Sequence, residues 1–342
     1  MIEKARSAGA GGQAIPLTDD ICCYLIAVIA RDLEILDRFP ELPQDVSPLF
    51  ESAELDRLRV PDVPFLPLME RLVEFNADAD TFFACLASLH KRRLKYERIL
   101  QTQPIPTIEQ VGPRGLLQFG TLSSRALTGL LFWRKWFFDI DNRAGQETGY
   151  LFEPIIAHAI GGVPFSAKAS PVRRAGDSRK GRQVDCVRDK MAYEFKIRVT
   201  IASSGQGRWQ EELDFPVDCR RSRYTPVLVV LDATPNAKLA QLEAAFLEQQ
   251  GKVYKGESAW QHLDAAAGPT MALFLEKYVR DPIQALLGEV TDVLPEFVAT
   301  MCEGKITFTV GGESLSIARS PDEDELENGE LPEDVADQIP GP

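Results

Sequence analysis

The chain has 342 residues and a formal net charge of −13, and 44% of its residues are hydrophobic and 26% charged. This composition is ordinary for a globular protein of about two domains and excludes a fibrous, collagen-like or wholly disordered chain. The longest unbroken apolar run, Ile21–Ala30, is too short to cross a bilayer and lacks the basic flank of a signal peptide. We therefore expect a soluble cytoplasmic protein without membrane association.

The first 145 residues are predicted to be mainly helical. Residues 1–16 are rich in Gly and Ala and show no periodic pattern, which indicates a flexible N-terminus. From residue 17 on, apolar side chains recur at the three- and four-residue spacing of buried helix faces. Helices are expected from Ile21 to Leu36, over Asp80–Gln101 and over Ser123–Asp139. We predict that residues 17–145 form a helical region used for specificity or dimerisation.

The third of these helices carries an aromatic stripe that includes Trp133, Trp136, Phe137 and Phe138. Aromatic side chains can stack on nucleic-acid bases. An aromatic stripe at helical spacing is, however, more often part of a hydrophobic core. We expect these four residues to belong to the core.

Residues 146–255 are predicted to form a mixed α/β core. Helical segments alternate with short β-branched or apolar segments, an order typical of α/β folds. The expected elements are a helix at Gly149–Ile160, strands at Gln183–Val187 and Met191–Ile201, a helix at Gly207–Asp214, a strand at Thr225–Leu231 and a helix at Lys238–Gln249. The last of these strands is apolar almost throughout, as expected for a strand buried on both faces.

Residues 256–320 are predicted to form a helical addition that ends in a hairpin. Helices are expected at Met271–Leu287 and Val290–Met301, and the hairpin strands at Lys305–Val310 and Ser314–Ala318. Residues 321–342 contain nine acidic residues and no basic one. We expect them to form a disordered acidic tail.

The charge is unevenly distributed, which keeps nucleic acid open as a partner. Without the nine acidic residues of the tail, the net charge is −4. The segment Lys168–Arg208 holds eleven Lys or Arg residues and four Asp or Glu residues, a net charge of +7. A local basic field of this kind attracts phosphates even on an acidic protein.

Three residues on the two central strands carry the chemistry that we expect. Side chains alternate along a strand, so Glu194 and Lys196 share one face of Met191–Ile201. If Gln183–Val187 pairs with this strand, the carboxylate of Asp185 meets that of Glu194. Adjacent carboxylates repel unless a cation lies between them, and oxygen ligands favour Mg²⁺ or Mn²⁺ over Zn²⁺. A neighbouring lysine can orient water and stabilise charge on a phosphate.

An ordinary salt bridge on an exposed strand is the competing explanation for Glu194 and Lys196. The Glu-x-Lys pattern alone is weak, since a second copy, Glu303-Gly304-Lys305, lies at a glycine turn without a partner acid. The basic segment, the buried strand and an acidic residue on the preceding helix, Glu153, favour a nuclease site. The cysteines and histidines show no spacing typical of zinc ligands.

This arrangement resembles the PD-(D/E)xK nuclease motif. Asp185 corresponds to its first acid, Glu194-Phe195-Lys196 to its ExK, and Glu153 to the acid that many members carry on the preceding helix, whereas Val184 replaces the consensus proline. A longer stretch, residues 147–236, is similar to the ApaLI-like group of type II restriction endonucleases. The similar segments are Gly149–Pro154, Lys180–Asp185, Tyr193–Arg198, Gly205–Trp209 and Pro226–Pro235.

The resemblance implies a restriction-endonuclease-like mixed-sheet core and a type II site-specific deoxyribonuclease that cuts double-stranded DNA within a short palindrome. It implies Asp185, Glu194, Lys196 and Glu153 as catalytic residues, with the metal held by Asp185 and Glu194. The implied cofactor is Mg²⁺, for which Mn²⁺ can substitute. A prokaryotic homodimer and a companion DNA methyltransferase acting on the same site are expected as well.

DNA contacts are expected from basic and polar residues around the predicted site. They are Lys168, Arg173, Arg174, Arg179, Lys180, Arg182, Gln183, Arg198, Gln206 and Arg208. Basic side chains bind phosphates, and an arginine can read a guanine edge. On the helix that follows, Gln210 or Glu211 could hold the water of the metal.

Two alternatives stay open from the sequence. One is a DNA repair or structure-specific nuclease with the same core, which would prefer nicks, ends or lesions. The other is a non-catalytic DNA-binding protein, which would leave DNA intact.

Overall fold

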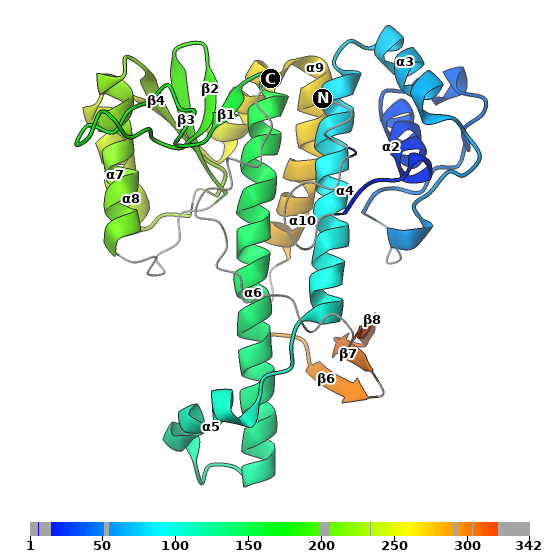
Figure 1. The fold of residues 1–342 in the computed structure, drawn as a ribbon, viewed down its shortest axis with the longest axis vertical. Helices are drawn as coiled ribbons and strands as arrows, with labels where there is room; N and C mark the ends of the chain where they lie inside the picture. The colour runs from blue at the N-terminus through cyan, green and yellow to red at the C-terminus, as the bar shows by residue number, and fades with distance from the viewer. Residues whose placement is uncertain are drawn as a thin grey trace.

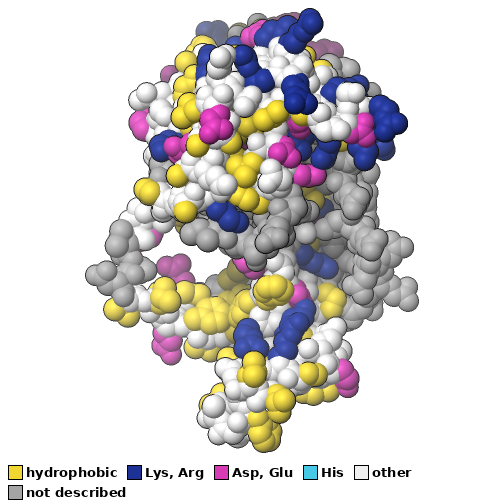
Figure 2. Space-filling model, turned by 90° about the vertical axis from the view of Figure 1, so that its left-hand side faces the viewer, with side chains coloured by type: hydrophobic (Ala, Val, Ile, Leu, Met, Phe, Trp, Pro, Cys, Tyr) yellow, Lys and Arg dark blue, Asp and Glu magenta, His cyan; other side chains and the backbone are white. Residues whose placement is uncertain are grey.

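The computed structural model describes residue 6 and residues 15–50, 55–197, 206–232, 234–289, 293–302 and 304–320, apart from the side chains at 56 and 206–208. The predicted acidic tail and most of the predicted flexible N-terminus lie outside these residues. A five-stranded sheet, a helical body and a projecting arm are arranged along one long helix, α6 (Figure 1). Seen from the side of the sheet, the arm extends below the body (Figure 2).

Helices make up most of the described chain. They are α2 (Asp19–Asp32), α3 (Phe65–Phe75), α4 (Ala79–Thr102), α5 (Ile108–Gly115), α6 (Ser124–Ala159), α7 (Gln206–Arg221), α8 (Ala237–Glu248), α9 (Glu257–Leu275) and α10 (Asp281–Gly288), with short turns η1 (Leu36–Arg38), η2 (Leu55–Arg57), η3 (Leu116–Gln118) and η4 (Glu276–Arg280). Among the described residues, no helix combines the length and the hydrophobicity needed to span a lipid bilayer.

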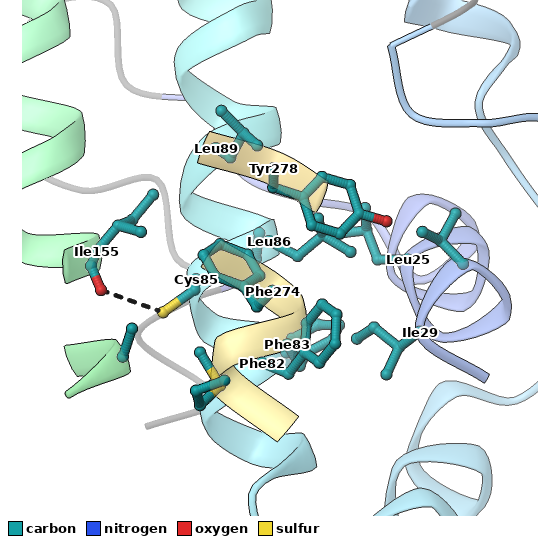
Figure 3. Close-up of a cluster of buried hydrophobic side chains, with 14 of the residues drawn as sticks. Leu25, Ile29, Phe82, Phe83, Cys85, Leu86, Leu89, Ile155, Phe274 and Tyr278 are labelled. Carbon is teal, nitrogen blue, oxygen red and sulfur yellow. Dashed lines mark hydrogen bonds between the residues drawn. The ribbon is translucent and has the colours of Figure 1, made fainter. Parts of the chain in front are cut away.

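In the helical body, α4 and α9 pack against α6, and α2 and α3 pack against α4 (Figure 1). Its centre contains Leu25 and Ile29 from α2, Phe82, Phe83 and Leu86 from α4, and Phe274 and Tyr278 from α9 and η4 (Figure 3). The Cys85 thiol donates to the Ile155 carbonyl at 3.9 Å and thereby connects α4 to α6. The helices predicted at the start of this region and over Asp80–Gln101 are confirmed, because their apolar spacing matches the buried faces.

Helix α6 is 36 residues long and joins two helices that the sequence pattern predicted as separate, Ser123–Asp139 and Gly149–Ile160. It also crosses the predicted boundary between residues 145 and 146. The polar stretch between the predicted helices packs along α4, where Arg92 and Lys95 form ion pairs with Glu147 at 2.5 and 2.7 Å. The predicted break was wrong, because apolar periodicity does not report polar contacts between helices.

The larger sheet has five strands in chain order: β1 (Val163–Phe165), β2 (Val184–Arg188), β3 (Met191–Lys196), β4 (Thr225–Val230) and β5 (Lys252–Lys255). β1, β2 and β3 pair antiparallel, whereas β3, β4 and β5 pair parallel. Helices α7 and α8 provide the crossovers that parallel pairing requires. The three predicted strands are confirmed, although the part of Met191–Ile201 beyond residue 197 lies outside the described residues. β1 and β5 are too short to show a pattern in the sequence.

Helices cover both faces of this sheet. Toward α6 and the helical body point Cys186, Tyr193, Phe195, Val227 and Val229. Toward α7 and α8 point Val184, Ala192, Leu228 and Val230. Burial on both faces fixes the register of the strands, since a shift by one residue would exchange the faces. The predicted mixed α/β class is confirmed.

A second sheet of three antiparallel strands follows, β6 (Phe297–Cys302), β7 (Lys305–Val310) and β8 (Glu313–Ala318). The predicted terminal hairpin is therefore confirmed. The helix predicted over Val290–Met301 is wrong, because its described part runs into β6. Val298 and Thr300 are β-branched, and pairing with β7 decides the structure of this ambiguous segment.

Of the four aromatic residues on α6 that were predicted to belong to the core, three do. Trp133, Trp136 and Phe137 pack with Phe308 of β7. Phe138 is 59% exposed, so the prediction was wrong for this residue. Successive side chains on a helix are rotated by about 100°, and this turns Phe138 away from the face that meets β7.

Helix α5 and the N-terminal part of α6 form the arm that projects from the body (Figure 1). A small cluster of Val111, Leu127, Leu131 and Phe132 holds the arm together. Other apolar side chains of the arm are solvent-exposed: Ile108, Leu116, Leu117, Phe119 and Leu122. Clustered exposed apolar residues on a folded protein are typical of interaction surfaces.

Candidate active site

Asp185 and Glu194 come together where β2 and β3 separate. Cys186 and Tyr193 are the last registered pair at this end of the two strands, and Asp185 and Glu194 are the next residue on each strand. The Asp185 carboxylate accepts a hydrogen bond from the backbone N–H of Phe195 at 2.8 Å. This bond holds the carboxylate beside β3, and the structure thus brings together the two acids that the sequence suggested.

Lys196 lies on the same face of β3 as Glu194, and its ammonium group contacts two carboxylates. Its Nζ is 2.8 Å from Glu194 Oε1 and 3.5 Å from Glu212 Oε1 on α7. Burial lowers the pKa of Lys196, but the charges of Glu194, Glu212 and Asp185 outweigh burial and raise it above its usual value. Lys196 is therefore a positive charge and a hydrogen-bond donor in this site.

Glu153 reaches the same cluster from the C-terminal part of α6. It lines a small cavity together with Phe195, Lys196 and apolar residues of α6 and β4. Burial and then the charge of Glu194 raise the pKa of Glu153 to about 7, although Lys196 opposes this rise. A carboxyl group with this pKa exchanges protons near neutral pH.

The carboxylates of the cluster repel one another. Burial, followed by the charges of Glu194 and Glu153, raises the pKa of Asp185 well above its usual value. A divalent cation would relieve this repulsion, and Asp185 and Glu194 offer the oxygen ligands that Mg²⁺ prefers. In the described part of the chain, no group of three or more His, Cys, Asp or Glu side chains is positioned to hold a metal ion. Asp185 and Glu194 are the residues of this cluster that would hold such a cation.

A groove lined by basic side chains shares α7 with this cluster. Its basic residues are Lys168, Arg173, Arg174, Arg179, Lys180 and Arg182, all from the loop between β1 and β2. Glu211 lines the groove, whereas the next residue, Glu212, contacts Lys196. Figure 2 shows Lys and Arg side chains spread over the upper part of the face on the sheet side.

The basic loop is folded back on itself and fixed to α7. Arg173 and Gly181 form an antiparallel bridge. The backbone N–H of Ala175 donates to Asp218 at 2.5 Å, and that of Arg173 donates to Ser222 Oγ at 2.8 Å. The loop therefore presents its side chains from a defined frame, which lowers the entropic cost of binding.

The predicted DNA-contact residues of this loop differ in exposure. Lys168, Arg173, Arg179 and Lys180 are exposed. Arg182 is 5% exposed; it lies 3.3 Å from Asp218 and donates to the backbone carbonyl of Glu211. These contacts favour a structural role for Arg182.

The other predicted DNA contacts are placed only in part. Arg174 is half-buried and forms an ion pair with Glu211 at 2.8 Å. Gln183 is exposed directly before β2. Arg198 and the side chains of Gln206 and Arg208 lie outside the described residues.

The residue of α7 that reaches the cluster is Glu212, which the sequence analysis missed. Gln210 and Glu211, the residues predicted for this role, pair with side chains that line the groove. Glu212, Phe215 and Cys219 have the spacing of one helix face, and Phe215 and Cys219 are buried against the sheet. That spacing is the signal that could have identified Glu212.

Two comparisons with known proteins match regions of the chain that include this cluster. A family model of the ApaLI-like restriction endonucleases matches residues 62–280. The chain is also 42% identical over 333 residues to the type II restriction enzyme ApaLI of Acetobacter pasteurianus. This alignment covers 90% of the present chain and 89% of that enzyme. No solved structure matches the chain. The match to the family model and this identity show that the chain belongs to the ApaLI-like restriction endonuclease family.

Proposed function

We propose that this protein is a type II restriction endonuclease that cuts double-stranded DNA within a short palindromic sequence and uses a PD-(D/E)xK active site. The observation that carries the proposal is the meeting of Asp185, Glu194 and Lys196 at the end of the β2–β3 pair, next to a basic groove. Membership of the restriction endonuclease family supports the reaction. The mixed sheet covered by helices on both faces supports the assigned core.

Asp185 and Glu194 are the proposed metal ligands. The ion is Mg²⁺, for which Mn²⁺ can substitute, and when bound it supplies positive charge to the phosphate and lowers the pKa of water. Asp185 is already oriented by the Phe195 amide. The donor set contains no thiolate or imidazole, which favours these ions over zinc.

Lys196 and Glu153 act on water and on the phosphate. The protonated Lys196 donates hydrogen bonds to the attacking water and stabilises the negative charge that develops on the phosphate oxygens. Glu153 can hold or release a proton at its carboxylate near neutral pH, because burial raises its pKa to about 7. In-line attack on the phosphorus leaves 5′-phosphate ends.

The basic loop binds the DNA backbone in this proposal. Lys168, Arg173, Arg179 and Lys180 are the exposed cations that contact phosphates, together with Arg174, Gln183, Arg198, Gln206 and Arg208. Arg182 holds the loop in place through Asp218. Phosphate contacts of this kind position the enzyme, whereas contacts to base edges select the sequence.

A second copy of the chain completes the enzyme. A palindrome is cut most simply by a two-fold symmetric dimer in which each copy cuts one strand. The arm formed by α5 and the start of α6 offers an exposed apolar surface for this contact, since Leu117 is 93% exposed and Phe119 73%. We assign the homodimer interface to this arm.

The proposal places the enzyme in the prokaryotic cytoplasm together with a DNA methyltransferase of the same specificity. An endonuclease that cuts intact duplex at fixed sites would also cut the chromosome of its own cell. A companion methyltransferase that modifies the same site protects that chromosome.

One experiment tests the proposed reaction directly. The purified protein is incubated with phage DNA of known sequence, with Mg²⁺ or with EDTA, and the products are separated on a gel. Discrete bands that appear only with Mg²⁺ are expected, and sequencing their ends gives the site and the stagger. A smear would indicate a repair or non-specific nuclease. Intact DNA with Mg²⁺ and Mn²⁺, on modified and unmodified substrate, would indicate a binding protein.

A further inference from the structure

Lys196 occupies a carboxylate that the proposed metal ion needs. Its Nζ lies 2.8 Å from Glu194 Oε1, and both side chains are more than three-quarters buried. An ammonium group and a divalent cation that share one carboxylate repel each other, most strongly where water is largely excluded. Binding of a cation to Glu194 therefore weakens this contact and favours movement of Lys196 away from the carboxylate.

Glu212 is a second acceptor within reach of the same ammonium group. Its Oε1 lies 3.5 Å from Lys196 Nζ, so a small rotation of the lysine side chain shortens this contact as the other one lengthens. The position of Glu212 is fixed, because Phe215 and Cys219 on the same face of α7 are buried in the core under the sheet. A buried ammonium group that leaves one partner needs such a replacement, since an unpaired buried charge is strongly destabilising.

We propose that Glu212 receives Lys196 when Glu194 binds the metal ion. Glu212 is thus a positioning residue that acts through Lys196 and is not itself a metal ligand. Without it, Lys196 stays paired with Glu194 and competes with the ion. The inference rests on the proposed function, because it takes Glu194 as a metal ligand.

The test is a double-mutant cycle on metal affinity in the full-length protein without DNA. Mn²⁺ binding is measured from the loss of the electron paramagnetic resonance signal of free Mn²⁺, for the wild type, Glu212→Gln, Lys196→Met and the double variant. We expect Glu212→Gln to weaken Mn²⁺ binding by roughly tenfold in the wild type. In the Lys196→Met background, the same substitution should change the affinity by less than about threefold.

Two results would overturn the inference. An equal loss of Mn²⁺ affinity in both backgrounds would show that Glu212 acts directly on the ion and not through Lys196. An unchanged Mn²⁺ affinity of Glu212→Gln would show that Glu212 has no role in metal binding. Glu243→Gln is the matched control, because Glu243 of α8 forms an ion pair with Lys255 of β5 at 2.8 Å, outside the cluster. The Mn²⁺ affinity of this variant should equal that of the wild type.

Failure of the proposed function gives a different result from failure of this inference. If the wild type binds no Mn²⁺, or if Asp185→Asn binds it as well as the wild type does, the metal site itself is wrongly assigned. Circular dichroism during heating shows whether each variant is folded. Lys196→Gln replaces Lys196→Met in the cycle if the latter does not fold.

Discussion

Asp185 is subject to two opposing effects at the level of the single residue. The hydrogen bond from the Phe195 amide favours the charged carboxylate, whereas burial and the neighbouring carboxylates favour the protonated form. Burial and the charges of Glu194 and Glu153 outweigh the hydrogen bond and raise the pKa of Asp185 well above its usual value. A cation beside Asp185 would favour the charged form of its carboxyl group.

Removal of this charge gives the first prediction. Asp185→Asn keeps the shape of the side chain, and Lys196→Ala removes the ammonium group. We expect each substitution to lower the cleavage rate on the order of 10³-fold or more, because Asp185 is a proposed metal ligand and Lys196 stabilises the developing negative charge. DNA affinity, measured by fluorescence anisotropy in Ca²⁺, should stay largely unchanged. If both variants cut at the wild-type rate, the site assignment is wrong.

His90 of α4 gives a prediction about stability and pH. It is fully buried, and neither ring nitrogen has a hydrogen-bond partner among the described residues. Burial, with smaller effects of Arg93 and Arg59, lowers its pKa from 6.5 to about 4. The unfolded chain therefore binds more protons between these two values. The stability that neutral His90 confers is complete above pH 6.5 and is lost as the pH falls toward 4.

The magnitude can be checked by urea unfolding. At 1.36 kcal/mol per pKa unit, the loss from this group approaches about 3 kcal/mol near pH 4. His90→Leu should show a weaker fall of the unfolding free energy between pH 7 and pH 4.5 than the wild type. The comparison concerns the slope, so a constant offset between the two proteins does not matter. Identical slopes would show that His90 does not titrate in this way.

The loop between β1 and β2 carries the prediction for DNA binding at the scale of elements. Arg179 and Lys180 are exposed at its turn. The double substitution to Ala should weaken DNA binding and reduce the slope of log K against log salt by about 0.9 for each lost phosphate contact. Lys190→Ala is a suitable control, because Lys190 lies at the turn at the other end of β2 and β3 and should leave the slope unchanged. If the salt dependence of DNA binding equals that of the wild type, the loop does not contact the DNA phosphates.

Arg182 and Arg179 belong to one loop but should behave differently when changed. Arg182→Gln breaks a buried ion pair with Asp218, and we expect a loss of about 3 kcal/mol in the free energy of unfolding. Arg179→Gln changes a side chain that is 90% exposed and should cost less than about 0.5 kcal/mol. Chemical denaturation of both variants measures the difference. Equal effects would contradict the structural role assigned to Arg182.

The elements that could be predicted from the sequence are those with a strong local pattern. Helix α4 shows apolar spacing over six turns, and β4 is almost continuously apolar, so both were recognised. Short strands such as β1 and β5 carry too few residues for a pattern. Strand β6 was predicted as helix because its residues suit either state. Its pairing with β7 decides between the two states, and this pairing cannot be read from the local sequence pattern.

In the candidate site, too, the relations fixed by local sequence could be predicted, and those that depend on tertiary packing could not. Asp185, Glu194 and Lys196 could be found because strand alternation and a short turn fix their relation within twelve residues. The contact of Lys196 with Glu212 depends on how α7 is rotated against the sheet. That rotation is set by the packing of Phe215 and Cys219 in the core, which the spacing of charged residues does not reveal.

At the scale of the whole molecule, the arm gives a prediction about assembly. Leu117→Lys and Phe119→Lys place charges on side chains that are 93% and 73% exposed, so the fold of a single chain should tolerate them. We expect the combined variant to sediment as a monomer, because a charge in an apolar interface is costly. It should nick supercoiled DNA more slowly and rarely linearise it. A variant that remains a dimer would place the interface elsewhere.

Because α6 is continuous from Ser124 to Ala159, the arm and the candidate cluster lie near the two ends of one helix. Glu153 follows Ser124 by 29 residues, which at 1.5 Å per residue is about 44 Å. The C-terminal end of α6 packs in the same core as Tyr193 and Phe195 of β3, so Glu153 is held beside the strand that carries Glu194 and Lys196. The arm is therefore connected to the candidate cluster through the backbone of a single helix.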